Sequence, residues 1–255
     1  MLGRGCLVVM PGHHSRTRLL HRACRLTPKQ AAQHPWLIIS PHPDDETLGA
    51  GGLISTILSA GGSVNVAYLT DGAGSHVDAP GWTPRRVAAL RAREAATALR
   101  TLGSVRTPLH LGWRDAAPAA PGSATFMKTV ARLVSLSRRR DIRHIVTSWA
   151  GDPHCDHEAA AAIGAAVAKR LRLKPSHYCV WGWTLPNVDR RMCGMRAIAL
   201  PIASVRGQVR RALNCHRSQL GGRIFGAKEQ FILPRPMRRL VDARHIILLE
   251  DRHAA

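Results

Sequence analysis

Two short stretches of this 255-residue chain bring histidine and aspartate close together in the sequence. The first is Pro-His-Pro-Asp-Asp-Glu at residues 41–46, which contains His42, Asp44 and Asp45. Imidazole nitrogen and carboxylate oxygen are common zinc ligands, and a second carboxylate beside a ligand could transfer a proton. The prolines on both sides of His42 argue against an ordinary acidic surface turn. We therefore interpret this stretch as part of a metal site with an acid–base group next to it.

The second stretch is Asp-Pro-His-Cys-Asp-His-Glu at residues 152–158. His154 and His157 are three residues apart at the start of a predicted helix, so both imidazoles could reach one site. Asp156 lies between them and could accept a hydrogen bond that orients an imidazole. Taken alone, this stretch could equally be a capping aspartate followed by two surface histidines.

Each stretch follows an apolar run that predicts a buried strand, at residues 36–40 and 142–148. Prolines 41 and 43 end the first strand, so we expect the acids at 44–46 to lie on a stiff, non-helical loop. The carboxyl ends of parallel strands share one sheet edge, where open α/β sheets bind ligands. A His and an Asp from one loop and a His from the other would leave a zinc position open for water, as in catalytic sites.

The alternation of strands and helices predicts an α/β fold with a Rossmann-like, doubly wound and mainly parallel sheet in three layers. We expect a basic extension at residues 1–34 and a single α/β domain at residues 35–255. The predicted strands are 36–40, 63–69, 107–111, 142–148, 177–184, 196–200 and 244–249, and the predicted helices are 16–26, 48–60, 85–102, 126–137, 159–171 and 203–218.

Composition narrows the cellular setting. No window contains 18 uninterrupted apolar residues, so we expect no membrane span. The apolar run near the amino end is too short for a convincing signal peptide, which makes a cytoplasmic location the default. The six cysteines form no CxxC pair and do not suggest a disulfide framework, which agrees with a reducing compartment.

The net charge of +21 favours anionic partners, including a substrate that carries phosphate or carboxylate. However, only five of the 37 basic residues are lysine, and a codon bias toward GC-rich triplets explains the same arginine excess. The arginines are dispersed in short clusters, and the chain contains no nucleic-acid-binding motif. We therefore expect no nucleic acid partner.

Together, the stretches at 41–46 and 152–157 and the Leu-Thr-Asp-Gly-Ala-Gly sequence at 69–74 resemble the PIG-L/LmbE family of zinc-dependent N-acetylglucosaminyl deacetylases. Further similarities are Arg91 with Glu94, Asp115 after Leu-Gly, and Cys-His-Arg-Ser-Gln at 215–219. The resemblance covers roughly residues 36–220 and implies an LmbE-like fold.

The resemblance implies one zinc ion (Zn2+) per chain, with His42, Asp45 and His157 as its ligands. It also implies that Asp44 is the general base and that His154 polarises or protonates the reacting group. Residues expected to support the site or to contact substrate are Glu46, Asp71, Arg91, Asp115 and Asp156.

The implied activity is that of a metal-dependent N-deacetylase, a carbon–nitrogen hydrolase acting on linear amides. It would remove the N-acetyl group from a small N-acetylglucosamine-containing glycoconjugate and release acetate and a free amine. The alternatives are a zinc amidase for a non-sugar or differently acylated amide, and a basic binding protein on the same fold. A homo-oligomer is compatible with the sequence. We expect the substrate to be selected by rim loops at 76–84, 113–123 and 184–195.

Overall fold

The computed structural model describes residues 12–252, so the prediction about a signal peptide at the amino end lies outside the described residues. The described part contains an eight-stranded sheet in the order β1-β8-β10-β7-β6-β2-β3-β5, in which only β10 runs against the other strands. A small second sheet pairs β4 with β9. The strands are β1 Cys24–Arg25, β2 Trp36–Ser40, β3 Val64–Thr70, β4 His76–Val77, β5 Leu109–Trp113, β6 His144–Ser148, β7 Pro175–Tyr178, β8 Met195–Pro201, β9 Glu229–Gln230 and β10 His245–Asp251.

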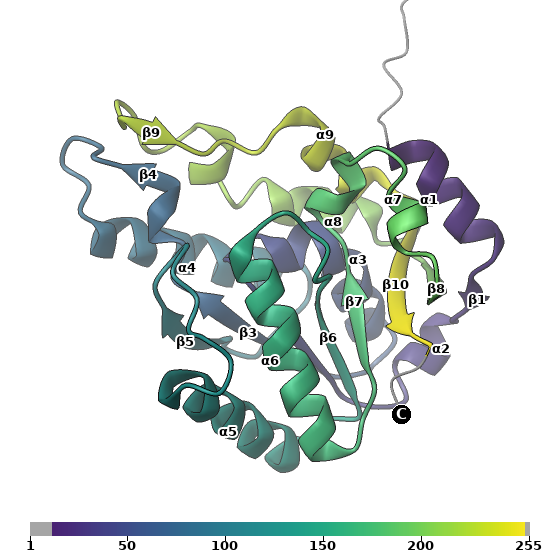
Figure 1. Ribbon diagram of the computed structural model, residues 1–255. Coiled ribbons are helices and arrows are strands. Elements are labelled where there is room, and N and C mark those ends of the chain that lie inside the picture. The colour runs from purple at the N-terminus through teal and green to yellow at the C-terminus, as the bar shows by residue number, and fades with distance from the viewer. Residues whose placement is uncertain (1–11, 253–255) are drawn as a thin grey trace, which may run out of the picture.

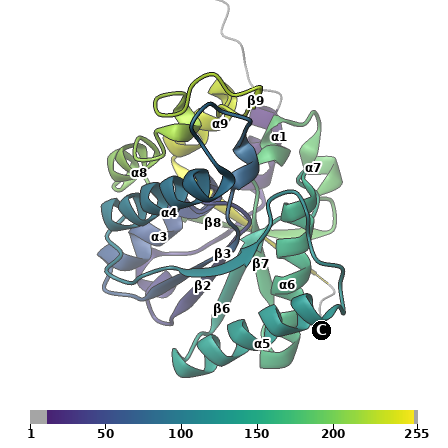
Figure 2. The same cartoon turned by 90° about the vertical axis from the view of Figure 1, so that its left-hand side faces the viewer.

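Helices cover both faces of the large sheet, so the predicted three-layer, mainly parallel α/β fold is confirmed (Figures 1 and 2). Helices α5 and α6 lie on one face, and α3, α4 and α8 lie on the other. The α-helices are α1 Gly12–His21, α2 Pro28–Ala31, α3 Asp45–Ser59, α4 Pro84–Thr101, α5 Ala124–Arg139, α6 Cys155–Leu171, α7 Val188–Arg191, α8 Arg206–Leu213 and α9 Arg235–Arg238; short 3-10 helices lie at η1 Ala73–Ser75, η2 Trp181–Thr184, η3 Ser218–Leu220 and η4 Arg239–Asp242.

The central strand β2 shows why this part of the sequence forms a buried strand. Successive side chains point to opposite faces of a sheet. Leu37 and Ile39 therefore join the core beneath α5 and α6, while Trp36 and Ile38 join the core beneath α3. All five residues of β2 are buried, because helices cover both of its faces.

Strand β2 is also the point at which the order of the sheet reverses. The chain continues from β2 to β3 and β5 on one side, and later places β6 and β7 on the other side. Loops after β2 and β6 diverge at such a reversal and leave a crevice beyond the carboxyl ends of the strands. Both stretches that combine histidine with aspartate leave the sheet at this crevice.

Helix α3 contains glycine at two points of close contact with neighbouring side chains. A Cβ atom on Gly49 would lie 2.1 Å from the Tyr178 ring, and one on Gly52 would lie 2.5 Å from the Cδ1 atom of Ile202. These glycines lower the helix propensity of the sequence, but they permit a close approach that any larger residue would prevent.

Helices α3 and α6 both begin earlier than predicted, and both starts lie at the crevice. Helix α3 begins at Asp45 rather than at residue 48, so the prediction that Asp45 and Glu46 lie on a non-helical loop is wrong. Acidic residues in a first turn are stabilised by the helix dipole. Helix α6 begins at Cys155 rather than at residue 159, because the His154 side chain caps it by accepting the Asp156 backbone N–H at 3.2 Å.

Two later elements are shorter than predicted. The strand predicted at 177–184 ends at Tyr178, because the Asp152 carboxylate accepts the backbone N–H groups of Val180 and Gly182 and turns the chain away from the sheet. The helix predicted at 203–218 is confined to Arg206–Leu213.

The described part of the amino-terminal segment packs against the sheet. Strand β1 pairs in parallel with β8 at the sheet edge, and Leu19 of α1 is fully buried. Arg18 of α1 forms an ion pair with Asp189 of α7. The boundary between an extension and a domain at residue 34 stays a prediction.

The sequence predicts neither a membrane span nor a disulfide framework, and residues 12–252 bear on both predictions. No helix in this range combines the length and apolar character needed to cross a bilayer. The five cysteines in this range, Cys24, Cys155, Cys179, Cys193 and Cys215, are free thiols.

Candidate metal centre and pocket

The side chains of His42, Asp45 and His157 converge on one buried point. The Oδ2 atom of Asp45 lies 2.9 Å from Nδ1 of His42 and 3.2 Å from Nε2 of His157. The two residues of the first stretch come from the end of β2 and the start of α3, and His157 comes from the first turn of α6. The structure therefore brings the three predicted metal ligands together.

The surroundings of these three residues fit a metal ion. The Nε2 atom of His157 is buried and makes no well-formed hydrogen bond within the described residues. The opposite nitrogen, Nδ1, lies 2.9 Å from Oδ2 of Asp152, and Nε2 of His42 lies 3.1 Å from Oδ2 of Asp156. Each imidazole thus directs one nitrogen to the common point and the other to a carboxylate. This arrangement is typical of metal-bound histidine, because the carboxylate fixes the tautomer and the ring orientation.

The charges at this point also favour a cation. Burial alone would lower the pKa of His157, but the carboxylates of Asp45 and Asp152 outweigh it and raise that pKa to about 9. Burial alone would raise the pKa of Asp45, but His157 and His42 hold it well below its usual value. Protons on the imidazoles therefore balance the carboxylates. A divalent cation would supply the same charge and release these protons on binding.

Asp44 lies beside this point and faces the pocket. Its Oδ1 atom is 3.2 Å from Nη2 of Arg91, and its backbone N–H donates to Oε2 of Glu46 at 3.0 Å. These contacts hold a backbone conformation with φ of +157°, which L-residues rarely adopt. Burial raises the pKa of Asp44 to about 6, although Arg91 opposes the shift. A carboxyl group with a pKa near neutrality suits proton transfer.

His154 lies on the other side of the common point and is half-buried. Its ring centroid is 4.7 Å from that of His42. Because Nδ1 of His154 accepts the Asp156 backbone N–H, a neutral His154 ring carries its proton on Nε2. Burial lowers the pKa of His154, which favours this neutral donor form.

The supporting residues predicted from the sequence fall into two groups. Asp115 and Arg91 line the pocket: Asp115 accepts the Gly74 backbone N–H at 2.9 Å, and Arg91 donates to the carbonyl of Gly72 at 2.8 Å. Asp71 is not a lining residue, and its carboxylate instead accepts the Ala73 backbone N–H at 3.0 Å.

Glu46 is fully buried behind Asp44 rather than in the pocket. Its Oε1 atom accepts the hydroxyl of Thr47 at 2.7 Å and lies 3.6 Å from Nε2 of His216. Burial alone would lower the pKa of His216, but Glu46 outweighs it and raises that pKa. His216 was not among the predicted site residues. Its one signal in the sequence is the Cys-His-Arg-Ser-Gln stretch at 215–219.

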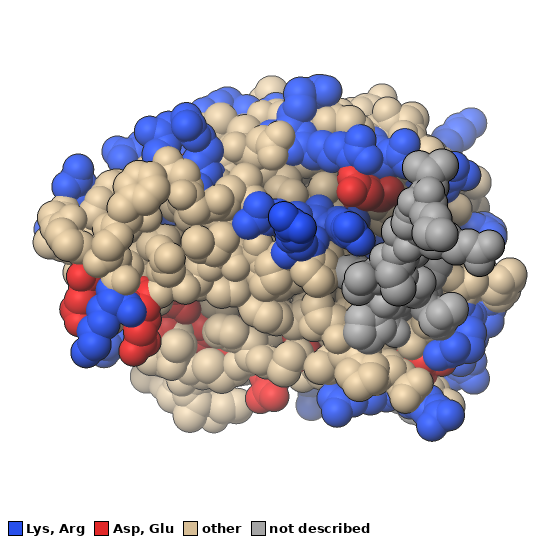
Figure 3. Space-filling view, turned by 90° about the horizontal axis from the view of Figure 1, so that it is seen from above, with Lys and Arg blue, Asp and Glu red and all other residues tan. Residues whose placement is uncertain are grey.

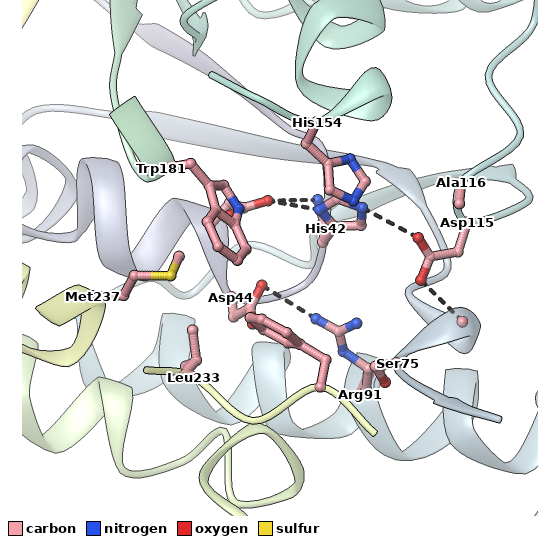
Figure 4. A pocket seen from close by; sticks show the side chains of 13 residues that line it. His42, Asp44, Ser75, Arg91, Asp115, Ala116, His154, Trp181, Leu233 and Met237 are labelled. Atoms are coloured by element: carbon pink, nitrogen blue, oxygen red, sulfur yellow. Dashed lines mark hydrogen bonds and ion pairs between the residues drawn. The ribbon is translucent and has the colours of Figure 1, made fainter. Parts of the chain in front are cut away.

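The pocket above these groups has a volume of about 300 Å³ and two unlike sides (Figure 4). Asp115 and Arg91 lie to one side of Asp44, and Trp181, Leu233 and Met237 lie to the other. Sequence reasoning missed the apolar side, which Phe231 completes. Of the predicted rim loops, only 113–123 contributes lining residues, Asp115 and Ala116. Residues 76–84 and 184–195 do not line this pocket, and their part in substrate selection stays a prediction.

The family model for GlcNAc-PI de-N-acetylase (PIG-L) matches residues 37–168, and the chain belongs to this family. The 1D-myo-inositol 2-acetamido-2-deoxy-alpha-D-glucopyranoside deacetylase of Mycobacterium leprae is 28% identical over 200 residues, which cover 68% of this chain and 64% of the relative. The match thus spans a little under two thirds of the length of that relative.

Solved structures share the fold. The A40926 pseudoaglycone deacetylase has a TM-score of 0.61 at 18% identity, with 88% of this chain and 99% of that chain covered. GalB, the 4-carboxy-2-hydroxymuconate hydratase of Pseudomonas putida KT2440, has a TM-score of 0.60 at 18% identity, with 86% and 95% covered. A deacetylase and a hydratase therefore share this architecture, and the reaction must be argued from the site.

Proposed function

We propose that this chain is a zinc-dependent hydrolase that removes the N-acetyl group from an N-acetylglucosamine-containing glycoconjugate. The observation that carries the proposal is the position of Asp44, a buried carboxyl group, beside the converging side chains of His42, Asp45 and His157. The activity of the Mycobacterium leprae relative supports the choice of substrate.

The donor set supports zinc. Two imidazole nitrogens and one carboxylate oxygen, with space on the pocket side, match the ligands of catalytic zinc sites. When bound, zinc brings the pKa of a bound water toward about 7 and polarises an acyl oxygen. His42, Asp45 and His157 would hold the ion, and Asp152 and Asp156 would orient the two imidazoles.

Residues of the pocket transfer the protons and stabilise the negative charge that develops on the acyl oxygen. Asp44 accepts a proton from the attacking water, and Arg91 keeps its carboxylate in place. His154 donates from Nε2 toward the acyl oxygen, where negative charge develops. Asp44 then returns the proton to the leaving nitrogen. Water and the amide are consumed, and acetate and a free amine are formed.

The test is acetate release by the zinc-loaded protein from methyl, inositol and second-sugar N-acetylglucosaminides. Asp44→Asn is expected to bind zinc normally and to lower kcat by roughly a hundredfold or more. Asp141→Asn is the matched control, because that exposed carboxylate pairs with Arg143 at the surface. A rate in Asp44→Asn equal to that of the control would remove Asp44 from the role of base. An absence of acetate release from every glycoside at full zinc occupancy would refute the proposed reaction.

A further inference from the structure

The apolar side of the pocket is lined by Trp181, Phe231, Leu233 and Met237, here called the apolar wall. The rings of Trp181 and Phe231 lie with their centroids 5.6 Å apart and their planes at 45°. Leu233 and Met237 are each 1% exposed. All four residues lie beyond the segment 37–168 that matches the family model.

Backbone hydrogen bonds hold the apolar wall in place. The Phe231 backbone N–H donates to the carbonyl of Ser75 at 2.8 Å, and the Leu233 backbone N–H donates to the carbonyl of Gln219 at 2.8 Å. Trp181 lies between Val180 and Gly182, whose backbone N–H groups are both held by the Asp152 carboxylate. The wall is thus positioned by the same scaffold that holds the candidate metal centre. A preformed wall binds a ligand without the entropy cost of ordering the side chains first.

The side chains of the apolar wall offer few hydrogen-bonding groups. Its side chains offer the indole N–H of Trp181 and the weakly accepting sulfur of Met237, and the other two are hydrocarbon. A polyol such as inositol would lose hydrogen bonds to water here and regain few of them. The opposite side, with Asp115 and Ser75, can instead pair with sugar hydroxyls.

The basic residues among the described lining residues do not favour an anionic ligand on this side of the pocket. Lys and Arg are scattered over the face seen from above (Figure 3). Arg91 is nevertheless the one lysine or arginine among the described lining residues. Its guanidinium is already occupied by Asp44 at 3.2 Å and by the carbonyls of Gly72 and Pro43. The described lining residues therefore include no free cation that could hold a phosphate or a carboxylate, despite the net charge of +21.

We propose that the substrate carries a hydrocarbon substituent, alkyl or aryl, which binds against the apolar wall while the sugar faces Asp115 and Arg91. This inference rests on the proposed function, because it assigns the substrate class of the same site. The hydrocarbon is either the aglycone of the glucosaminide or a longer acyl group that replaces the N-acetyl group of the proposed substrate. Both sources present the same chemistry to the wall.

The test measures binding separately from turnover. Zinc-loaded Asp44→Asn is titrated by calorimetry with methyl, butyl and hexyl N-acetylglucosaminides in one series. A second series uses methyl glucosaminides with N-acetyl, N-butanoyl and N-hexanoyl groups. In one of the two series, each added methylene is expected to lower Kd by roughly three- to fourfold, the value for burial of a methylene group.

Phe231→Ala, added to the same protein, is expected to flatten this dependence on chain length, and Phe231→Leu to restore part of it. Phe225→Ala is the matched control, because that side chain is 69% exposed in the same segment and does not line the pocket. A Kd that falls with chain length in the glycoside series assigns the hydrocarbon to the aglycone. A Kd that falls with chain length in the acyl series assigns it to the acyl group.

Kd values that do not change with chain length in either series, or an equal dependence on chain length in Phe231→Ala and Phe225→Ala, would overturn the inference. Its failure is distinguishable from that of the proposed function. If the wild-type protein releases acetate but Kd does not depend on chain length in either series, only the inference about the apolar wall is refuted. If Kd depends steeply on chain length but no acyl group is released, only the proposed deacetylase activity is refuted.

Discussion

Replacing Asp152 with asparagine should weaken both the fold and the metal centre. The Asp152 carboxylate is 1% exposed and serves four donors. Its Oδ2 atom lies 2.9 Å from Nδ1 of His157 and accepts the Val180 backbone N–H at 3.0 Å. Its Oδ1 atom accepts the Gly182 backbone N–H at 2.7 Å and lies 3.2 Å from the Cys179 sulfur. Asparagine turns one of the two oxygens into a donor, so either orientation of the amide sets an NH2 group against a backbone N–H.

The magnitude follows from these contacts. A buried backbone N–H without an acceptor costs about 1–3 kcal/mol, which is a large part of the roughly 5–15 kcal/mol that holds a domain folded. The loss of a carboxylate that orients a ligand histidine typically lowers metal affinity by about 10- to 100-fold. Asp152→Asn should therefore remain folded at room temperature with a lower free energy of unfolding and weaker zinc binding.

Two assays measure these effects independently. Urea unfolding of the metal-free protein gives the free energy of unfolding, and competition with a chromophoric chelator gives the zinc affinity. The exposed Asp141→Asn variant, which makes the same chemical change, should match the wild type in both assays. Zinc affinity and stability in Asp152→Asn that both equal those of Asp141→Asn would refute the reasoning.

Two further predictions concern packing and pH. In Gly49→Ala, the new Cβ would lie 2.1 Å from the Tyr178 ring, so urea unfolding should show a loss of about 1–3 kcal/mol from overpacking. In the control Gly207→Ala, the nearest atom is 3.7 Å away, and a loss of equal size there would contradict the packing argument. Burial lowers the pKa of His177 below its usual value of 6.5. The unfolded chain therefore binds a proton more readily below that pH, and stability should fall as pH falls, by at most about 1.4 kcal/mol per pH unit. His177→Gln should show a shallower fall between about pH 7 and pH 5 by urea unfolding, and parallel curves for the two proteins would show that His177 is not responsible.

Local patterns in the sequence were sufficient to predict much of the fold. The β2 prediction has the correct ends, because its five residues are apolar or small and are followed at once by proline. The convergence of His42 and His157 could also be expected, since both follow parallel strands whose carboxyl ends share one edge of the sheet.

The features that sequence reasoning missed depend on contacts between distant segments. Nothing local in residues 177–184 shows that the strand ends at Tyr178, because Asp152, far back in the chain, accepts the backbone N–H groups that would have continued it. Phe231 and Leu233 follow the two-residue strand β9 and have no periodic pattern. Their place in the pocket depends on tertiary hydrogen bonds to Ser75 and Gln219.

The shared carboxylate of Asp152 has a thermodynamic consequence for the two halves of the pocket. One oxygen fixes the ring of His157, and both oxygens hold the backbone on either side of Trp181. The ring of His157 and the backbone on either side of Trp181 thus depend on one carboxylate, and any coupling through it between metal and ligand must be reciprocal. Whatever factor a bound metal contributes to the affinity for a hydrocarbon ligand, that ligand must contribute the same factor to the affinity for the metal.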